Sequence, residues 1–100
     1  MTLTINNAGE KVVGTLQGRL DTAASAQFGV DMQPLMDAAD KHIVLDCAGL
    51  EFISSSGLRL FLSLRKQTIA KGGDVTIKNV TPEVKQVFTI TGFLSLFIFE

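Results

Sequence analysis

The sequence HIVLDCAGLEFISSSGLRLFLSLRK (residues 42–66) decides how this chain folds. It begins with the apolar, β-branched run His42–Cys47, which is typical of a short strand buried on both faces. A serine-rich loop follows, and then a helical stretch over about 55–70, which Gly72-Gly73 ends. Asp74–Val80 is again strand-like, and a strand–helix–strand unit is nearly always right-handed with parallel strands. The apolar side of the helix is expected to be Leu58, Phe61, Leu62, Leu64 and Ile69.

The residues before this unit predict two more strands and a helix. Segments 3–6 and 11–17 are separated by turn-forming residues and read as a hairpin. Asp21 or Thr22 can then cap a helix that runs to about residue 40. Pro34 removes a backbone donor from that helix, so we expect a kink or a break before it.

The residues after the unit continue the alternation. Thr81 can cap a helix whose first position is Pro82, and Thr91-Gly92 suits its end. Segment 95–100 is predicted to be a final strand. We therefore expect an α/β domain over residues 1–100, with a mixed sheet of four or five strands and helices packed on it.

The composition fits a compact domain and argues against several classes of function. Hydrophobic residues make up 46% of the 100 and charged residues 19%, which allows a sizeable core. Nine Lys and Arg are offset by ten Asp and Glu, so the chain lacks the basic stripe that nucleic acids require. No apolar run approaches the roughly 20 residues that span a bilayer, and the N-terminus does not resemble a signal peptide. We expect a cytoplasmic protein that binds neither nucleic acid nor membrane.

The single cysteine and single histidine limit the chemistry that the chain can perform. Cys47 lies within an apolar run and is expected to be a small buried hydrophobe, and alone it can form neither an internal disulfide nor a thiolate metal cluster. His42 precedes the same run as a strand-edge residue. A serine hydrolase needs a base near its nucleophile, and the Gly-x-Ser-x-Gly pattern is absent. We therefore expect no enzyme activity, no cofactor and no metal site.

Three consecutive serines, Ser54, Ser55 and Ser56, lie where the strand gives way to the helix. One hydroxyl can cap the helix, and Ser54 and Ser56 are the better candidates for that role. The start of a helix also favours an anion, so a bound phosphate or a phosphorylated serine is the alternative interpretation. A nucleotide fits less well because Gly-x-x-x-x-Gly-Lys-Ser/Thr is absent. Gly57 suggests a close backbone approach, and Gly57→Ala is expected to leave the fold stable while weakening partner binding.

Segment 52–58, Phe-Ile-Ser-Ser-Ser-Gly-Leu, resembles the signature of STAS domains position by position, in particular that of bacterial anti-sigma factor antagonists. Segments 18–21, 43–46, 72–73, 82–84 and 91–93 resemble further family stretches along the chain. Two departures stand out. Ser54 replaces an aspartate that many members carry, and Pro34 is unusual within the first helix.

The resemblance implies that Ser55, two residues before the glycine, is a phosphoacceptor. It implies that the unphosphorylated domain binds an anti-sigma factor serine kinase and so frees a sigma factor, until the kinase phosphorylates the serine and a serine phosphatase restores it. The expected partner-binding residues are Asp21, Ser54, Ser55, Ser56 and Gly57, on a monomer or weak dimer. An alternative stays open: a STAS subunit of a lipid transporter or of a stress-signalling assembly, without a phospho-switch.

Overall fold

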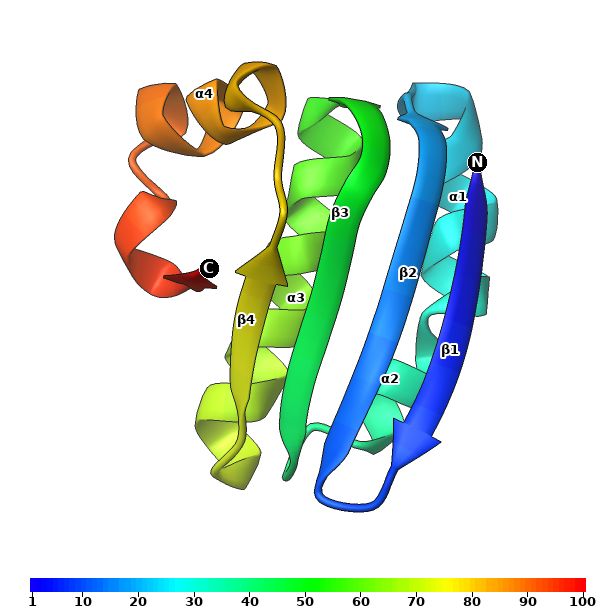
Figure 1. Cartoon of the computed structure of the whole chain (residues 1–100), viewed down its shortest axis with the longest axis vertical. Helices are drawn as coiled ribbons and strands as arrows, with labels where there is room; N and C mark the ends of the chain where they lie inside the picture. The colour runs from blue at the N-terminus through cyan, green and yellow to red at the C-terminus, as the bar shows by residue number, and fades with distance from the viewer.

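In the computed structural model, which describes residues 1–100, five strands form a sheet in the order β1-β2-β3-β4-β5 (Figure 1). The first two strands pair antiparallel, and each later strand is parallel to its neighbour. The sheet is therefore mixed, as predicted. The strands are β1 (Thr2–Ala8), β2 (Lys11–Leu20), β3 (His42–Ile53), β4 (Asp74–Lys78) and β5 (Ile98–Phe99).

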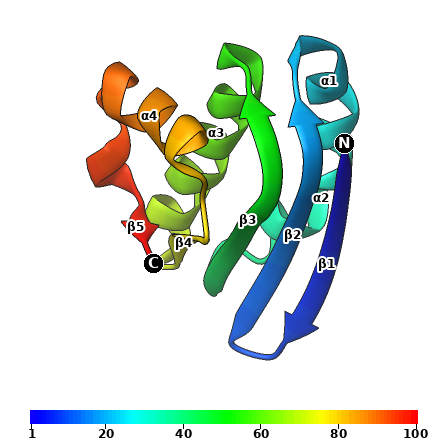
Figure 2. The ribbon, with the colours of Figure 1, turned by 45° about the horizontal axis from the view of Figure 1, so that its top comes forward.

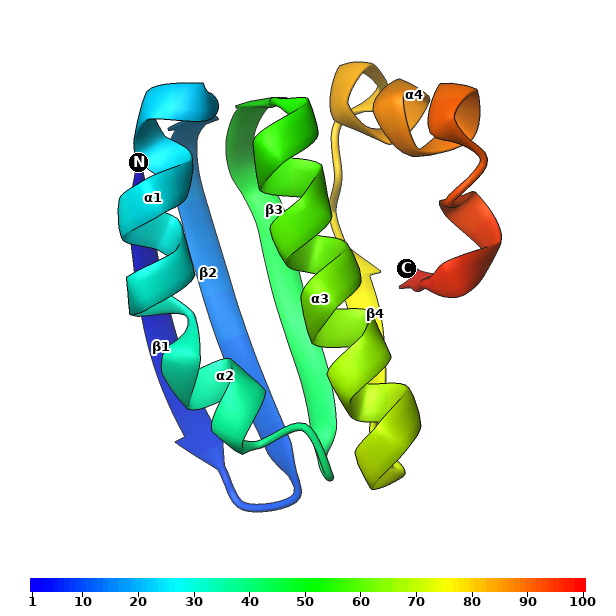
Figure 3. The same cartoon turned by 180° about the vertical axis from the view of Figure 1, so that it is seen from behind.

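Three helices cover one face of the sheet, and the opposite face carries none (Figures 1 and 3). They are α1 (Thr22–Asp31), α2 (Gln33–Asp37) and α3 (Ser55–Lys71). Helix α4 (Pro82–Thr91) stands beside them past β4, and a short 3₁₀ turn, η1 (Leu94–Leu96), leads to β5. None of these helices has the length and hydropathy needed to cross a bilayer.

Phenylalanine rings connect the helices through the core. The ring centroid of Phe61 on α3 lies 6.0 Å from that of Phe28 on α1 and 5.9 Å from that of Phe88 on α4. Phe88 also meets Phe97 edge-on at 5.4 Å. All four rings are buried in one cluster with the core-facing residues of β2, β3 and β4. The cluster fixes α1, α3 and α4 relative to the sheet, and so fixes where α1 and α3 begin.

The central strand is longer than its apolar run predicts. β3 continues past Cys47 to Ile53, so no serine-rich loop separates strand from helix. The pairing of β2 with β3 shifts twice, between Thr15 and Gln17 and between Gly18 and Arg19. Each shift adds one residue on β3, as in a β-bulge. The extra residues reset which side chains of β3 point to the core, so its apolar residues can be buried although they do not alternate regularly.

Two other predictions about the elements have different outcomes. The break before Pro34 is confirmed, because α1 ends at Asp31 and α2 begins at Gln33. The strand predicted over 95–100 is wrong for most of its length. The chain forms η1 there, and only Ile98 and Phe99 pair with β4. Phe97, which is 6% exposed, leaves the strand direction to pack against Phe88.

Candidate functional site

Helices α1 and α3 begin side by side at one end of the sheet. α1 follows β2 and α3 follows β3, and these strands are parallel neighbours whose last pair is Leu20 with Ile53 (Figure 2). The Ser54 N–H donates to the carbonyl of Leu20 at 2.8 Å, which holds the two strand-to-helix junctions together. Two segments that are distant in the sequence thus form one surface.

Each of these two helices has a side-chain cap. Asp21 Oδ1 accepts a hydrogen bond from the Ala24 N–H at 2.8 Å, and Ser54 Oγ accepts one from the Gly57 N–H at 3.1 Å. Both caps are among those that the sequence predicts. Ser54 is only 9% exposed, so its hydroxyl is already hydrogen-bonded and almost hidden from solvent. Asp21 and Ser54 therefore have clear structural roles at the start of their helices.

The other two serines differ in accessibility. Ser55, the first residue of α3, is exposed, and Ser56 is half-buried. Ser55 makes no side-chain hydrogen bond within the protein, so its hydroxyl is free to react. The free N–H groups and the dipole of a helix start favour a negative charge at that position. Of the two serines that do not cap the helix, Ser55 is the more accessible to a modifying enzyme.

Gly57 is the point where α3 contacts the end of β2. A Cβ built on Gly57 would lie 2.6 Å from Cγ and 2.8 Å from Cδ2 of Leu20, and 3.2 Å from the Leu20 carbonyl oxygen. The close backbone approach expected from the sequence is therefore present, but within the chain itself. These contacts argue against the expectation that Gly57→Ala leaves the fold stable, because the Leu20 side chain that the new Cβ would meet is fully buried.

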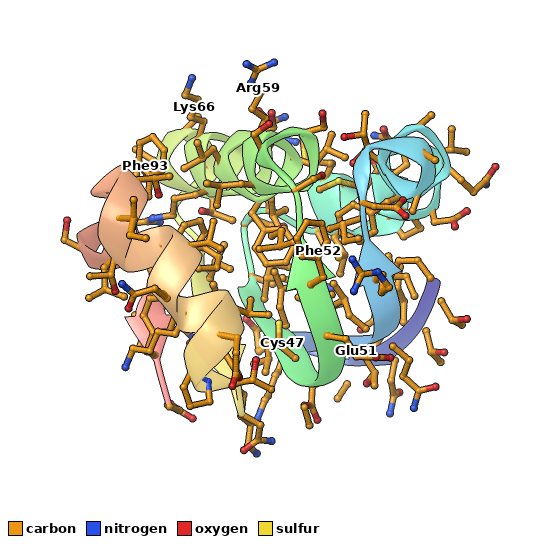
Figure 4. All side chains as sticks on the ribbon, turned by 90° about the horizontal axis from the view of Figure 1, so that it is seen from above. Cys47, Glu51, Phe52, Arg59, Lys66 and Phe93 are labelled. Atoms are coloured by element: carbon orange, nitrogen blue, oxygen red, sulfur yellow. The ribbon has the colours of Figure 1, made fainter.

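Arg19 and Phe52 form a stacked pair beside the two caps, which the sequence did not predict. The Arg19 guanidinium lies 4.6 Å from the centroid of the Phe52 ring, and both side chains are exposed. The two residues pair across β2 and β3, one step before Leu20 and Ile53. Figure 4 looks onto this end of the molecule and shows Phe52 close to where β3 leads into α3. The pairing depends on the register shifts in β3, which the sequence does not reveal.

The remaining reactive groups lie away from this surface. His42 begins β3, at the end of the strand opposite to Ser55, and its Nδ1 lies 3.0 Å from Asp74 Oδ1. Cys47 is buried as predicted, and burial together with the charge of Asp46 raises the pKa of its thiol to about 12. No group of three His, Cys, Asp or Glu side chains is placed to hold a metal ion.

The sequence matches a known protein family along nearly its whole length. The family model of the STAS domain matches residues 3–100. The chain belongs to the STAS-domain family. The chain is 34% identical over 97 residues to BtrV of Bordetella bronchiseptica, which carries the name of an anti-sigma factor antagonist; the match covers 97% of this chain and 84% of BtrV. It is also 30% identical over 82 residues to the anti-sigma F factor antagonist of Paenibacillus polymyxa, covering 81% of this chain and 70% of that one.

Solved structures of the Bacillus protein SpoIIAA share the fold. The unphosphorylated form of this anti-sigma factor antagonist superposes with a TM-score of 0.79 at 24% identity, over 99% of this STAS domain and 88% of that chain. The phosphorylated form gives a TM-score of 0.74 at the same 24% identity, over 99% and 91% of the two chains. The α/β architecture predicted from the sequence is therefore confirmed.

Proposed function

We propose that this STAS domain is an anti-sigma factor antagonist whose binding is switched off by phosphorylation of Ser55. In its unphosphorylated form it binds an anti-sigma factor serine kinase and so releases a sigma factor. The observation that carries the proposal is the difference between Ser54 and Ser55: the Ser54 hydroxyl is occupied as a cap, while the Ser55 side chain is exposed at the start of α3 and makes no hydrogen bond within the protein. The names of the two relatives support the same role.

The partner surface in this proposal is the pair of helix starts. Asp21 and Ser54 hold the α1 and α3 junctions, and Gly57 allows them to pack closely. Ser55 is exposed and Ser56 half-buried at the start of α3. The chain itself is the substrate of the kinase and of a serine phosphatase, and performs no catalysis in this cycle. Such a cycle takes place in the cytoplasm.

Phosphorylation can block binding without altering the fold. A phosphate adds about 1.5 to 2 negative charges at neutral pH, and the free N–H groups at the start of α3 tolerate that charge in the isolated domain. Within an interface the same charge has to lose its water, and a buried charge without a partner costs several kcal/mol. An increase of about 1.4 kcal/mol weakens binding tenfold, so one phosphate suffices to dissociate the complex.

The test uses purified anti-sigma factor kinases from the source organism. Each is mixed with the protein in the absence of ATP, and binding is measured by calorimetry. The kinase that binds is then incubated with the protein and ATP, and the site of modification is determined by mass spectrometry. We expect phosphate at Ser55 alone, and loss of binding in the modified protein. Absence of binding to every kinase, or phosphate only at Ser54 or Ser56, would contradict the proposal.

A further inference from the structure

Phe52 is unusual among the phenylalanines of this protein. The chain has seven, and Phe52 is the most exposed of them, with 38% of its surface accessible. The others lie in the core or pack against it. Its exposure follows from the register shift beside it, which directs Ile53 into the core and Phe52 outward. Phe52 is one of seven large apolar side chains that are exposed, and it is the one among them whose ring stacks on an arginine.

Arg19 has no polar partner within the chain. Its guanidinium lies over the Phe52 ring, but it forms neither a salt bridge nor a side-chain hydrogen bond within the chain. Asp21, two residues along, instead directs a carboxylate oxygen to the Ala24 N–H. The ring therefore holds the guanidinium in place while its five donors stay available.

The pair lies next to the proposed switch. Arg19 and Phe52 each stand two residues before a cap, Asp21 and Ser54 respectively, and the exposed Ser55 comes directly after the second cap. Aromatic and arginine side chains are the residues most enriched among those that dominate binding energy at protein interfaces. An exposed, pre-stacked pair loses little side-chain entropy when a partner covers it.

We propose that the Arg19–Phe52 pair is the anchor through which the unphosphorylated domain binds its anti-sigma factor kinase. The partner presents an apolar pocket for the Phe52 ring, with a carboxylate at its rim that accepts a bidentate pair of hydrogen bonds from Arg19. This inference rests on the proposed function. In this proposal the Arg19–Phe52 pair supplies most of the affinity for the kinase, and phosphorylation of Ser55 removes that affinity.

The test compares four variants in calorimetric titrations with the kinase that binds the wild-type protein. Phe52→Ala removes the ring and Arg19→Glu reverses the charge. Two matched controls make the same changes elsewhere: Ile98→Ala truncates an exposed apolar side chain on β5, and Lys11→Glu reverses a charge at the far end of β2. We expect Phe52→Ala and Arg19→Glu each to weaken binding roughly 10- to 30-fold, and the controls to stay within about twofold. The loss in Arg19→Glu should shrink as salt rises, because the carboxylate it repels is screened.

The outcomes separate the anchor from the switch. If Ser55→Asp abolishes binding while Phe52→Ala and Arg19→Glu bind like the wild type, the anchor is wrong and the proposed function stands. If no kinase binds the wild-type protein, the proposed function is wrong and the anchor with it. Equal losses in the controls also overturn the anchor. Thermal unfolding of each variant identifies any that fails to fold. If Arg19→Glu fails, Arg19→Lys replaces it, because lysine keeps the charge but loses the bidentate geometry. Its kinase affinity should fall about tenfold.

Discussion

Replacing Gly57 by alanine should destabilise this domain, although alanine is the better helix former. The new Cβ would lie 2.6 and 2.8 Å from two carbons of the Leu20 side chain, distances that real Cβ atoms essentially never show. Leu20 is fully buried, so its side chain has to shift within a packed core. Such overpacking costs about 1–3 kcal/mol, and three close contacts place this site at the upper end. Gaining helix propensity returns at most about 1 kcal/mol.

The unfolding free energy of Gly57→Ala should therefore fall by about 1–2 kcal/mol, which corresponds to a decrease in Tm of roughly 4–16 °C for a domain of this size. Urea denaturation and thermal unfolding measure both quantities. Gly29→Ala on α1 is the matched control. Its Cβ would lie 3.6 Å from the nearest atom, a Leu60 carbon, which is an ordinary contact. That variant should gain about 0.5–1 kcal/mol from propensity alone.

A double-mutant cycle ties the effect to one contact. In a Leu20→Ala background the two side-chain carbons that the new Cβ meets most closely are gone and only the Leu20 carbonyl oxygen at 3.2 Å remains, so Gly57→Ala should there lose most of its cost. If Gly57→Ala is as stable as the wild type in the natural background, or if its cost persists without the Leu20 side chain, the argument from close packing is wrong.

Three further predictions concern the serines and the cysteine. Ser54→Ala should lower the unfolding free energy by about 1 kcal/mol because α3 loses its cap, whereas Ser56→Ala should change it by less than about 0.5 kcal/mol. Equal unfolding free energies for the two variants in urea denaturation would refute the assignment of the cap. Ser55→Asp should raise stability by about 0.3–1 kcal/mol through the helix dipole while weakening kinase binding, and a fall in Tm would contradict that view of the helix start. Burial raises the pKa of Cys47 from 9.0 to about 12, so the thiol loses its proton at lower pH in the unfolded chain than in the folded one. The unfolding free energy should therefore fall as the pH rises from 9.0 towards 12. In Cys47→Ala this fall should vanish, and an unchanged slope of unfolding free energy against pH would show that another group causes it.

The order of strands and helices was predictable because its signals are local. Thr81 caps α4, Pro82 occupies its first turn, and Gly92 ends it with a φ of 78°, as the turn chemistry indicates. Helix α3 shows where local signals fail. Ile69 was expected on the apolar side but is 59% exposed, while Thr68 is fully buried one turn after Leu64. The Thr68 hydroxyl donates to the Arg65 carbonyl at 2.8 Å, so a polar residue satisfies itself at a core position that hydrophobicity alone would assign to a neighbour.

The site was predictable only in part, for a related reason. Asp21, Ser54 and Ser55 could be found because capping residues and a serine run are visible in the sequence. The contact of Gly57 with Leu20 and the stacking of Arg19 on Phe52 both depend on the alignment of β2 with β3. That alignment includes two register shifts, which follow from packing across the whole sheet rather than from any short segment.

The contacts around Ser55 determine how the proposed switch would work. Ser54 makes two hydrogen bonds: its N–H donates to the Leu20 carbonyl, and its hydroxyl oxygen accepts from the Gly57 N–H. Gly57 in turn packs on Leu20. In the proposed switch, a phosphate on Ser55 would therefore meet a junction that is held by these contacts, and the start of α3 would favour its charge. Any change in affinity has to come from the partner side of the interface, where the charge loses its water. A protein of this design would show nearly the same backbone in both states and differ only in what it can bind.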